Sequence, residues 1–296
     1  MKALVIGGTG TVGSQVVREL MARNAEVTVL TRSAKKQEAL PPGVKGIIGD
    51  LLDPRIVRSI FRGIDGVFLA NAIGVSETHQ GLMAINGLQF AAVPRVVYLG
   101  VHDMQQSPHL LHHGAKIAVE AALRASTTKF TILGASNFCQ NDLHFKHAML
   151  EHRVYPNPLG SIGVSRVDVR DIAEVAAIAL TTGTLDGQVV NLVGPDPLTG
   201  AGLTEIWGRV LDRPIRYIGE DLDAWEKEWI QLFPEFRTRV PPSILFDVRL
   251  TYALFIRQGL KGTPEDIDRL TRILGHPPRR FEDYARETAD EWLRAT

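Results

Sequence analysis

Four closely spaced glycines near the start of the chain form a loop of the kind that binds phosphate groups. The loop consists of Gly7, Gly8, Thr9, Gly10, Thr11, Val12 and Gly13. It fits the patterns GxGxxG and GxxGxxG at once, after a predicted strand over 2–6 and before apolar residues at helical spacing. In a loop between a strand and a helix, one glycine permits a positive φ, another lets the backbone approach a pyrophosphate, and the last lets helix and strand pack closely. The helix N–H groups and dipole also attract phosphate, so the sequence predicts that residues 7–13 bind a dinucleotide.

The second predicted strand, over 26–31, ends where folds of this kind distinguish NAD from NADP. An acidic residue about 20 positions past the glycines binds the ribose 2′-hydroxyl, whereas an arginine there accommodates a 2′-phosphate. Here Arg32 stands in that position, with Lys35 and Lys36 close behind it. We therefore predict NADP(H) as the cofactor, and the alternative is a basic loop that only faces water.

Two further strand ends bring polar residues to the same edge of the predicted sheet. We expect a strand over 44–49 that leads into Asp50 and Leu51, and a strand over 65–70 that is followed by Asn71. Ligands of open parallel sheets collect at the carboxyl ends of the strands. Asp50 and Leu51 are therefore predicted to lie beside the adenine, and Asn71 is predicted to contact the cofactor from the same edge.

Strands and helices alternate through the first two thirds of the chain. Strands are expected over 2–6, 26–31, 44–49, 65–70, 95–99, 129–133 and 188–193. This alternation predicts an α/β fold with a doubly wound parallel sheet, that is, a Rossmann fold. The residues GPDP at 194–197 interrupt the pattern. We accordingly expect an NADP(H)-binding domain over 1–195 and a smaller, mainly helical lobe for substrate or partner over 196–296.

The composition favours a small-molecule site over nucleic acid or a membrane surface. Lys plus Arg and Asp plus Glu number 33 each in a chain of 296 residues, so the net charge is zero. Cys139 is the only cysteine, which excludes an intramolecular disulfide and a multi-cysteine metal site. No apolar run approaches the length of a membrane span, and glycines interrupt the opening strand too early for a signal peptide. A cytoplasmic protein is expected.

Nine segments of the sequence together resemble one known family. They read GGTGTVG, LTRS, GDLLD, VVYLG, HGAKIAVEAALRAS, FTILGASNFCQN, VDVRDIAEVAAIAL, VVNLVGPDPLTGAGLTEIWGRVL and PRRFEDYARE. In this combination and order, the chain resembles the NmrA-like branch of the atypical short-chain dehydrogenases/reductases over nearly its whole length. The glycine motif alone is common to many NAD(P)-binding proteins, so the resemblance depends on the full set.

The resemblance implies where catalytic residues should lie. Short-chain reductases typically place a serine after the fifth strand and a YxxxK pair on the next helix. The serine holds the substrate carbonyl, the tyrosine protonates it, and the lysine holds the ribose. That spacing puts Lys116 in the lysine position and His112 in the tyrosine position, whereas Gly100 and Val101 stand where the serine is expected. His112 is a candidate acid because histidine exchanges protons near neutral pH, and the alternative is that it only lines the pocket.

The resemblance also assigns the segment after the sixth strand to the nicotinamide end of the cofactor. Phe138 and Asn141 are therefore expected to touch cofactor or substrate. A core phenylalanine and a turn asparagine are the alternatives. The aromatic residues of the second lobe are expected to be mainly core, and they are Trp207, Trp225, Trp229, Phe233, Phe236, Phe246, Tyr252 and Phe255.

Histidines gather in the region 102–113, which raises the possibility of a metal site. A zinc site needs three or four converging ligands with an oriented second shell, and HLLHH at 109–113 has no acidic residue near it in sequence. We therefore expect no metal, and interpret the histidines as surface or pocket-rim residues.

Two functions from different classes fit these observations. The first is an NADPH-dependent reductase that transfers hydride to a small planar acceptor, such as a quinone or a related carbonyl or enone compound, which asks little of a proton donor. The second is a non-catalytic NADP(H) sensor that binds a protein partner. The missing serine and tyrosine favour the sensor, whereas the aromatic second lobe favours the enzyme. An isomerase, epimerase or dehydratase has no specific support, and the chain is expected to act as a monomer or homodimer.

Overall fold

The computed structural model describes residues 1–234 and 240–294. They form two compact units: Met1–Ala135 with Val169–Leu192, and Ser136–Asp168 with Val193–Thr296. The second unit thus contains 136–168, whereas the sequence pattern assigns this segment to the first domain. The two short strands of this segment pair with strands from the C-terminal part of the chain, which explains the difference. The division of dinucleotide binding and substrate or partner binding between 1–195 and 196–296 stays a proposal.

A seven-stranded sheet forms the first unit, with the strand order β3-β2-β1-β4-β5-β6-β9. All neighbouring strands are parallel. The strands are β1 (Lys2–Ile6), β2 (Glu26–Thr31), β3 (Lys45–Ile48), β4 (Gly66–Leu69), β5 (Arg95–Val101), β6 (Lys129–Ala135) and β9 (Val189–Leu192). The direction of winding reverses between β1 and β4, which is where ligands bind in such sheets. The predicted doubly wound parallel sheet is confirmed.

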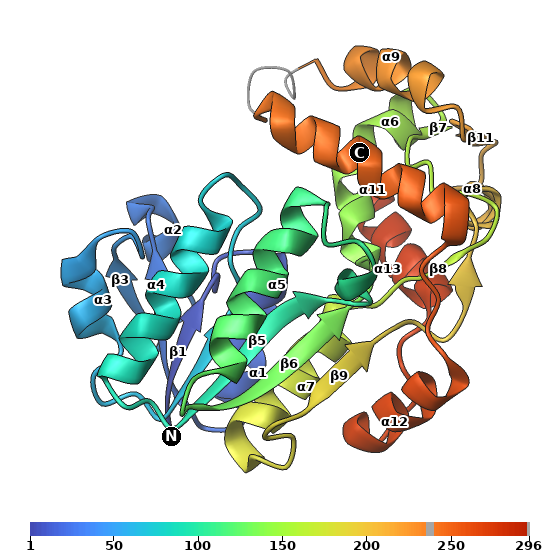
Figure 1. Cartoon of the computed structure of the whole chain (residues 1–296). Helices are drawn as coiled ribbons and strands as arrows, with labels where there is room; N and C mark the ends of the chain where they lie inside the picture. Colours follow the sequence, from blue (N-terminus) through green and yellow to red (C-terminus); the bar gives the residue numbers. More distant parts are fainter. Residues whose placement is uncertain (235–239, 295–296) are drawn as a thin grey trace. The chain divides into compact units, whose positions relative to one another are not determined.

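Helices cover both faces of this sheet (Figure 1). They are α1 (Thr11–Ala22), α2 (Ala34–Glu38), α3 (Pro54–Ile60), α4 (Glu77–Phe90), α5 (Leu111–Arg124) and α7 (Val169–Thr182), with the 3₁₀ turn η1 (Met104–Gln106). α1 packs against α7 on one face, and α3, α4 and α5 pack side by side on the other. Because both faces are covered, central strands such as β4 (GVFL) are apolar throughout and fully buried.

Helices dominate the second unit. Its elements are η2 (Cys139–Phe145), α6 (Lys146–Glu151), β7 (Val154–Tyr155), β8 (Val164–Ser165), β10 (Pro197–Leu198), α8 (Gly200–Val210), β11 (Arg216–Tyr217), α9 (Leu222–Leu232), α11 (Pro242–Gln258), α12 (Pro264–Leu274) and α13 (Phe281–Arg294). β8 pairs with β10 and β7 with β11, each in a two-stranded sheet.

The core of the second unit is aromatic, as the sequence predicts. Six of the named rings are buried, namely Trp207, Trp225, Trp229, Phe233, Tyr252 and Phe255. Trp207 stacks on Trp292 with ring centroids 5.1 Å apart and planes only 5° from parallel. Phe246 is 60% exposed and is the exception among the named rings that the structure describes. Phe236 lies outside the described residues.

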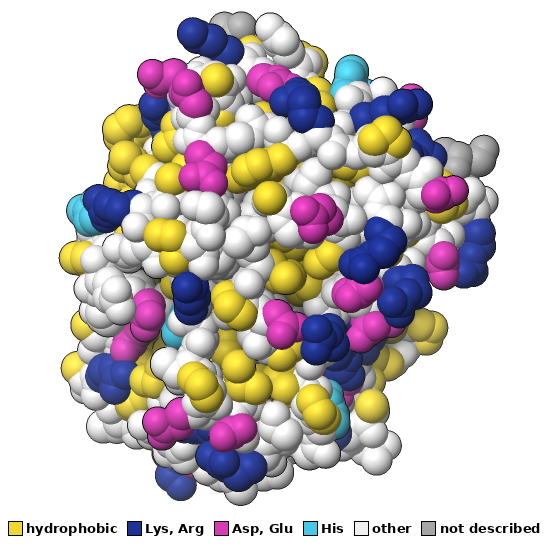
Figure 2. All heavy atoms as spheres, turned by 90° about the vertical axis from the view of Figure 1, so that its right-hand side faces the viewer, with side chains coloured by type: hydrophobic (Ala, Val, Ile, Leu, Met, Phe, Trp, Pro, Cys, Tyr) yellow, Lys and Arg dark blue, Asp and Glu magenta, His cyan; other side chains and the backbone are white. Residues whose placement is uncertain are grey.

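The surface carries mixed charge. On the face shown in Figure 2, lysines and arginines alternate with acidic side chains, and neither sign forms a continuous patch. This agrees with the equal number of basic and acidic residues. Within 1–234 and 240–294, none of the helices is both long and apolar enough to cross a membrane.

Candidate functional site

The glycine loop has the backbone geometry that its sequence predicts. Gly7 adopts φ +82°, and a Cβ added there would lie 2.6 Å from the carbonyl oxygen of Ala70. A Cβ on Gly13 would lie 2.1 Å from the carbonyl oxygen of Gly7, so α1 packs directly on the end of β1. Gly7 therefore makes the turn, and Gly13 permits the close packing of helix and strand.

The N-terminus of α1 is open to an anion. Gly10 is the N-cap, is exposed, and offers no side-chain oxygen to the first helical N–H groups. The first turn, which begins at Thr11, contains no acidic residue. Backbone N–H groups at such a terminus attract phosphate, because the helix leaves them without backbone acceptors.

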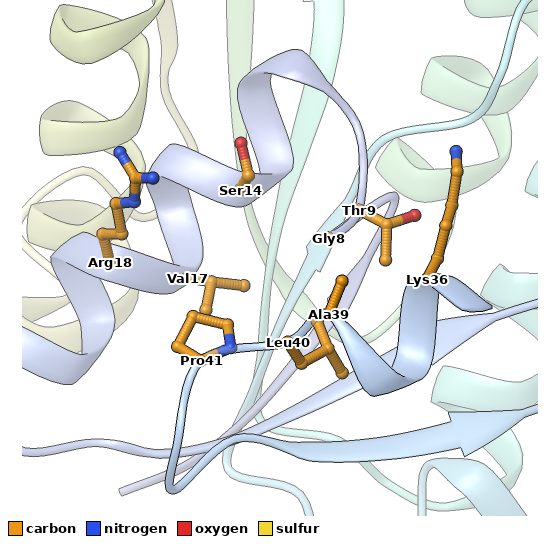
Figure 3. A pocket seen from close by; sticks show the side chains of 9 residues that line it. All are labelled: Gly8, Thr9, Ser14, Val17, Arg18, Lys36, Ala39, Leu40 and Pro41. Carbon is orange, nitrogen blue, oxygen red and sulfur yellow. The ribbon is translucent and has the colours of Figure 1, made fainter. Parts of the chain in front are cut away.

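Beside the loop lies a cavity of about 200 Å³. It is lined by Gly8, Thr9, Ser14, Val17, Arg18, Lys36, Ala39, Leu40 and Pro41. These residues come from the glycine loop, from α1 and from the α2 region (Figure 3). Two of them are cationic, two carry hydroxyl groups, and most of the others are apolar. Such a lining suits a phosphate ester attached to a less polar group.

Arg32 lies at the end of β2 with its side chain 66% exposed. Its Nη1 is 3.9 Å from Oδ2 of Asp50, which is a loose contact. Oδ1 of Asp50 accepts a hydrogen bond from the backbone N–H of Leu52 at 2.9 Å, and Leu51 is buried. The strand ends of β2 and β3 thus bring Arg32 and Asp50 together, as expected from the parallel pairing of these strands.

Asn71 follows β4 at the point where the winding reverses. It is 9% exposed, and within the described part of the chain neither polar atom of its amide has a hydrogen-bond partner. Buried amides are normally satisfied, because leaving one unpaired costs about 1–3 kcal/mol. Its donor and acceptor therefore fit a polar ligand at this edge, as the prediction for Asn71 requires.

Lys116 is buried in α5 and reaches back to β5. Its side chain is 4% exposed, and Nζ donates to the carbonyl oxygen of Leu99 at 2.9 Å. The ammonium also lies 5.2 Å from the centre of the Tyr98 ring, a cation–π contact. Nζ is 3.4 Å from Oε1 of Glu77. Lys116 is therefore not an exposed helix lysine.

Glu77, the first residue of α4, is the residue that sequence reasoning missed. It is 2% exposed, and its Oε2 lies 2.8 Å from Nδ1 of His112. One carboxylate thus contacts both residues predicted to be catalytic. In sequence it looks like an ordinary first-turn acid of a helix, and only the packing of α4 against α5 buries it.

Burial shifts two pKa values at this site. It lowers the pKa of Lys116, and the charge and hydrogen bond of Glu77 oppose that effect only in part. It also raises the pKa of Tyr98 far above its usual value, with help from the charges of Glu77 and Glu120. The Tyr98 phenol therefore stays neutral.

The neighbouring histidines have partners other than a metal. Nδ1 of His113 lies 2.6 Å from Oγ of Ser107, and both side chains are buried. His112 contacts Glu77, as described above, and Nε2 of His102 is 3.6 Å from Asp103. His102 and His113 are 3% and 5% exposed, so they are not surface residues, and a position at the rim of a pocket stays a prediction for them.

Phe138 and Asn141 lie in the second unit, in the segment that follows β6. The carbonyl oxygen of Phe138 accepts from Nη2 of Arg166 at 2.5 Å and from the N–H of Asn141 at 3.2 Å. A backbone bridge also links Phe138 to Val167. Their contact with cofactor or substrate stays a prediction.

Known proteins resemble this chain in sequence or in fold. An NAD(P)H azoreductase from Xenophilus azovorans is 29% identical over 289 residues, covering 97% of this chain and 97% of that protein. An NADPH-dependent quinone oxidoreductase from Escherichia coli, solved with NADPH, has a TM-score of 0.82 at 22% identity and covers 97% of this chain and 99% of its own. Citrobacter sp. triphenylmethane reductase, solved with NADP(H), has a TM-score of 0.81 at 21% identity, covering 98% and 100%.

The two solved structures are similar to this chain in fold. The family is shown separately, by a profile of the NmrA-like family that matches residues 1–236. This match includes the glycine loop, the buried Lys116 and the segment after β6, and it extends over most of the 296 residues. The chain therefore belongs to the NmrA-like family.

Proposed function

We propose that this protein is an NADPH-dependent oxidoreductase that transfers hydride to a small planar acceptor, such as a quinone or a related carbonyl or enone compound. The observation that carries the proposal is the common location of three features. The glycine loop follows β1, Asn71 follows β4, and Lys116 binds the carbonyl of Leu99 in β5. These strands are neighbours, so the three features share the carboxyl edge where the winding reverses. The reductase names of the relatives support the same class.

Each part of the cofactor has residues to hold it in this proposal. The loop 7–13 and the N-terminus of α1 bind the pyrophosphate. Arg32, together with Lys36 from the cavity lining, binds the 2′-phosphate, and Asp50 and Leu51 lie beside the adenine. Lys116 donates to a ribose hydroxyl with the part of its ammonium that Leu99 and Glu77 do not occupy. When bound, NADPH supplies a hydride from its nicotinamide.

The acceptor class follows from the proton donors at the site. Position 112 carries histidine in place of the usual tyrosine, and the hydroxyl of Tyr98 is buried and neutral. An acceptor such as a quinone takes up hydride without strong acid catalysis, so His112 or water completes its protonation. Phe138 and Asn141 are proposed to contact the nicotinamide end or the acceptor.

We expect Arg32→Asp to reduce the preference for NADPH over NADH by about tenfold to a hundredfold. The substitution removes a charged donor to the 2′-phosphate and adds a repelling carboxylate. Isothermal titration with both dinucleotides measures the preference. Lys35→Asp is the matched control, because Lys35 is exposed in the same segment and does not line the cavity. If the preference of Arg32→Asp equalled that of the control, the 2′-phosphate assignment would be wrong.

Turnover tests the function itself. Purified protein is supplied with NADPH and a panel of quinones, enones, azo compounds and aldehydes, and NADPH consumption is followed. We expect turnover with at least one planar acceptor, and a loss of at least about a hundredfold in Lys116→Met, because the nicotinamide ribose loses its anchor. Lys129→Met is the control, since Lys129 begins β6 at the opposite edge of the sheet.

A sensor of the NADP(H) state is the second candidate, favoured by the absence of the serine and tyrosine. It predicts tight NADPH binding without turnover on any acceptor. That result would remove the reductase proposal and would redirect the search to a protein partner.

A further inference from the structure

Glu77 contacts both residues that act in the proposed reaction, His112 and Lys116. Its Oε2 is 2.8 Å from Nδ1 of His112, and its Oε1 is 3.4 Å from Nζ of Lys116. Glu77 and Lys116 are almost fully buried, whereas the His112 side chain is 20% exposed. The Glu77 carboxylate is therefore shielded from water on the side of the sheet. It contacts the buried ammonium of Lys116 and the partly exposed imidazole of His112.

The shared carboxylate favours the charged form of Lys116. Burial favours the neutral amine, and Glu77 is the carboxylate that contacts the ammonium. The neutral phenol of Tyr98 on β5 also faces Lys116, and Glu120, whose charge acts on Tyr98, lies one turn further along α5. Glu120 is paired with Arg124 at 2.7 Å, so its charge is already compensated. Removal of the Glu77 charge would leave Lys116 buried without a counter-charge.

The same carboxylate selects one tautomer of His112. A carboxylate only accepts hydrogen bonds, so the short contact requires a proton on Nδ1. In the neutral ring Nε2 is then the basic nitrogen, through which the imidazole exchanges a proton. A buried acid that fixes a histidine tautomer is known to matter greatly for the histidine's action as acid or base.

We propose that Glu77 is a positioning residue that holds Lys116 as an ammonium ion and His112 as the Nδ1–H tautomer for hydride transfer to the acceptor. The effect of Glu77 on catalysis rests on the proposed function. The tautomer of His112 and the charge of Lys116 can be measured without any turnover. Neither the glycine loop nor the residues around the adenine take part in it.

The first measurement is ¹⁵N NMR of the imidazole rings, with His112 assigned by its loss in His112→Gln. We expect the neutral ring to be the Nδ1–H tautomer in the wild type and in Glu120→Gln, which removes a nearby buried carboxylate that does not contact His112. In Glu77→Gln the tautomer is expected to shift towards Nε2–H, because an amide no longer requires the Nδ1 proton. An unchanged tautomer in Glu77→Gln would overturn the proposal.

The second measurement is the Kd for NADPH as a function of pH. Because Glu77 opposes the fall of the Lys116 pKa, its removal lets Lys116 lose its proton at a lower pH. In Glu77→Gln, binding should therefore weaken as pH rises, by up to about tenfold per pH unit, at pH values where the wild type and Glu120→Gln still bind fully. Identical pH profiles in all three proteins would contradict the role of Glu77.

Turnover separates this inference from the proposed function. With an accepted quinone, kcat of Glu77→Gln should fall by about tenfold to a hundredfold with little change in KM for the acceptor. If the wild type shows no turnover, the proposed function fails, while the tautomer and pH profile still decide the role of Glu77. If Glu77→Gln does not fold, Glu77→Ala replaces it, which removes the carboxylate altogether. A mixture of tautomers is then expected, and the wild-type tautomer alone would refute the proposal.

Discussion

Replacement of Arg166 by methionine is expected to lower the free energy of unfolding of the second unit by about 3–5 kcal/mol. Arg166 and Asp142 are both fully buried, and Nη1 of the arginine is 2.9 Å from Oδ2 of the acid. Burial acts to lower the pKa of Arg166, but Asp142, together with Tyr155 and Cys139, raises it by more, so the guanidinium stays charged. Among the residues that the structure describes, the variant leaves the buried Asp142 carboxylate with only the hydroxyl of Tyr155 and the indole of Trp207. Urea denaturation followed by tryptophan fluorescence measures the loss.

An exposed ion pair of the same unit provides the control. Arg216 pairs with Glu228, and its side chain is 56% exposed, so Arg216→Met should change the free energy of unfolding by less than about 1 kcal/mol. Arg166 also donates to Asn137 and to the carbonyl of Phe138. We therefore expect its loss to loosen the segment after β6 as well. Equal midpoints for Arg166→Met and Arg216→Met would show that the buried pair does not hold this unit together.

Substitution of alanine for Gly13 is expected to weaken NADPH binding by at least about a hundredfold. The added Cβ would lie 2.1 Å from the carbonyl oxygen of Gly7 and 2.8 Å from Cα of Gly8. Relief of this overlap requires α1 to move away from β1, which displaces the N–H groups that we propose bind the pyrophosphate. The same strain should cost about 1–3 kcal/mol of stability. Isothermal titration gives the Kd, and urea denaturation gives the stability.

Gly74→Ala is the matched control in the same unit. Its Cβ would meet no atom of the described chain within 4 Å, and its φ is not in the left-handed region. It should bind NADPH as the wild type does. Wild-type affinity in Gly13→Ala would mean that the glycine loop is not the pyrophosphate site.

The sequence allowed the first unit to be predicted because its signals are local. Buried parallel strands appear as short apolar runs, and the glycine loop lies directly between one such run and a helix. β1 and β2 have the predicted bounds, Lys2–Ile6 and Glu26–Thr31. The turn at Gly7 and the packing at Gly13 follow from steric rules that apply to any chain.

The second unit could be predicted much less well. Its strands β7, β8, β10 and β11 have two residues each, too few to show any period in sequence. Each of them pairs with a strand more than thirty residues away. The membership of 136–168 in this unit depends on those distant pairs, so no local pattern reveals it.

The sequence allowed Lys116 and His112 to be placed on one helix, but their catalytic roles stay predictions and their shared contact was not predicted. The family spacing identified Lys116 and His112, and the structure places both on α5 beside a common partner. That partner, Glu77, lies at a helix start, where an acid is normally exposed and favourable. Its burial comes from the packing of α4 on α5. This is a tertiary contact, and no short motif in the sequence indicates it.

Single-turnover oxidation of NADPH bound to the wild-type protein tests the central claim most directly. Protein in excess over NADPH is mixed with each planar acceptor, and the nicotinamide absorbance is followed beside free NADPH with the same acceptor. The account predicts oxidation by at least one quinone, enone or azo compound well above the rate without protein, and loss of this acceleration in Lys116→Met. NADPH that binds tightly but is oxidised no faster than free NADPH by every acceptor would contradict it.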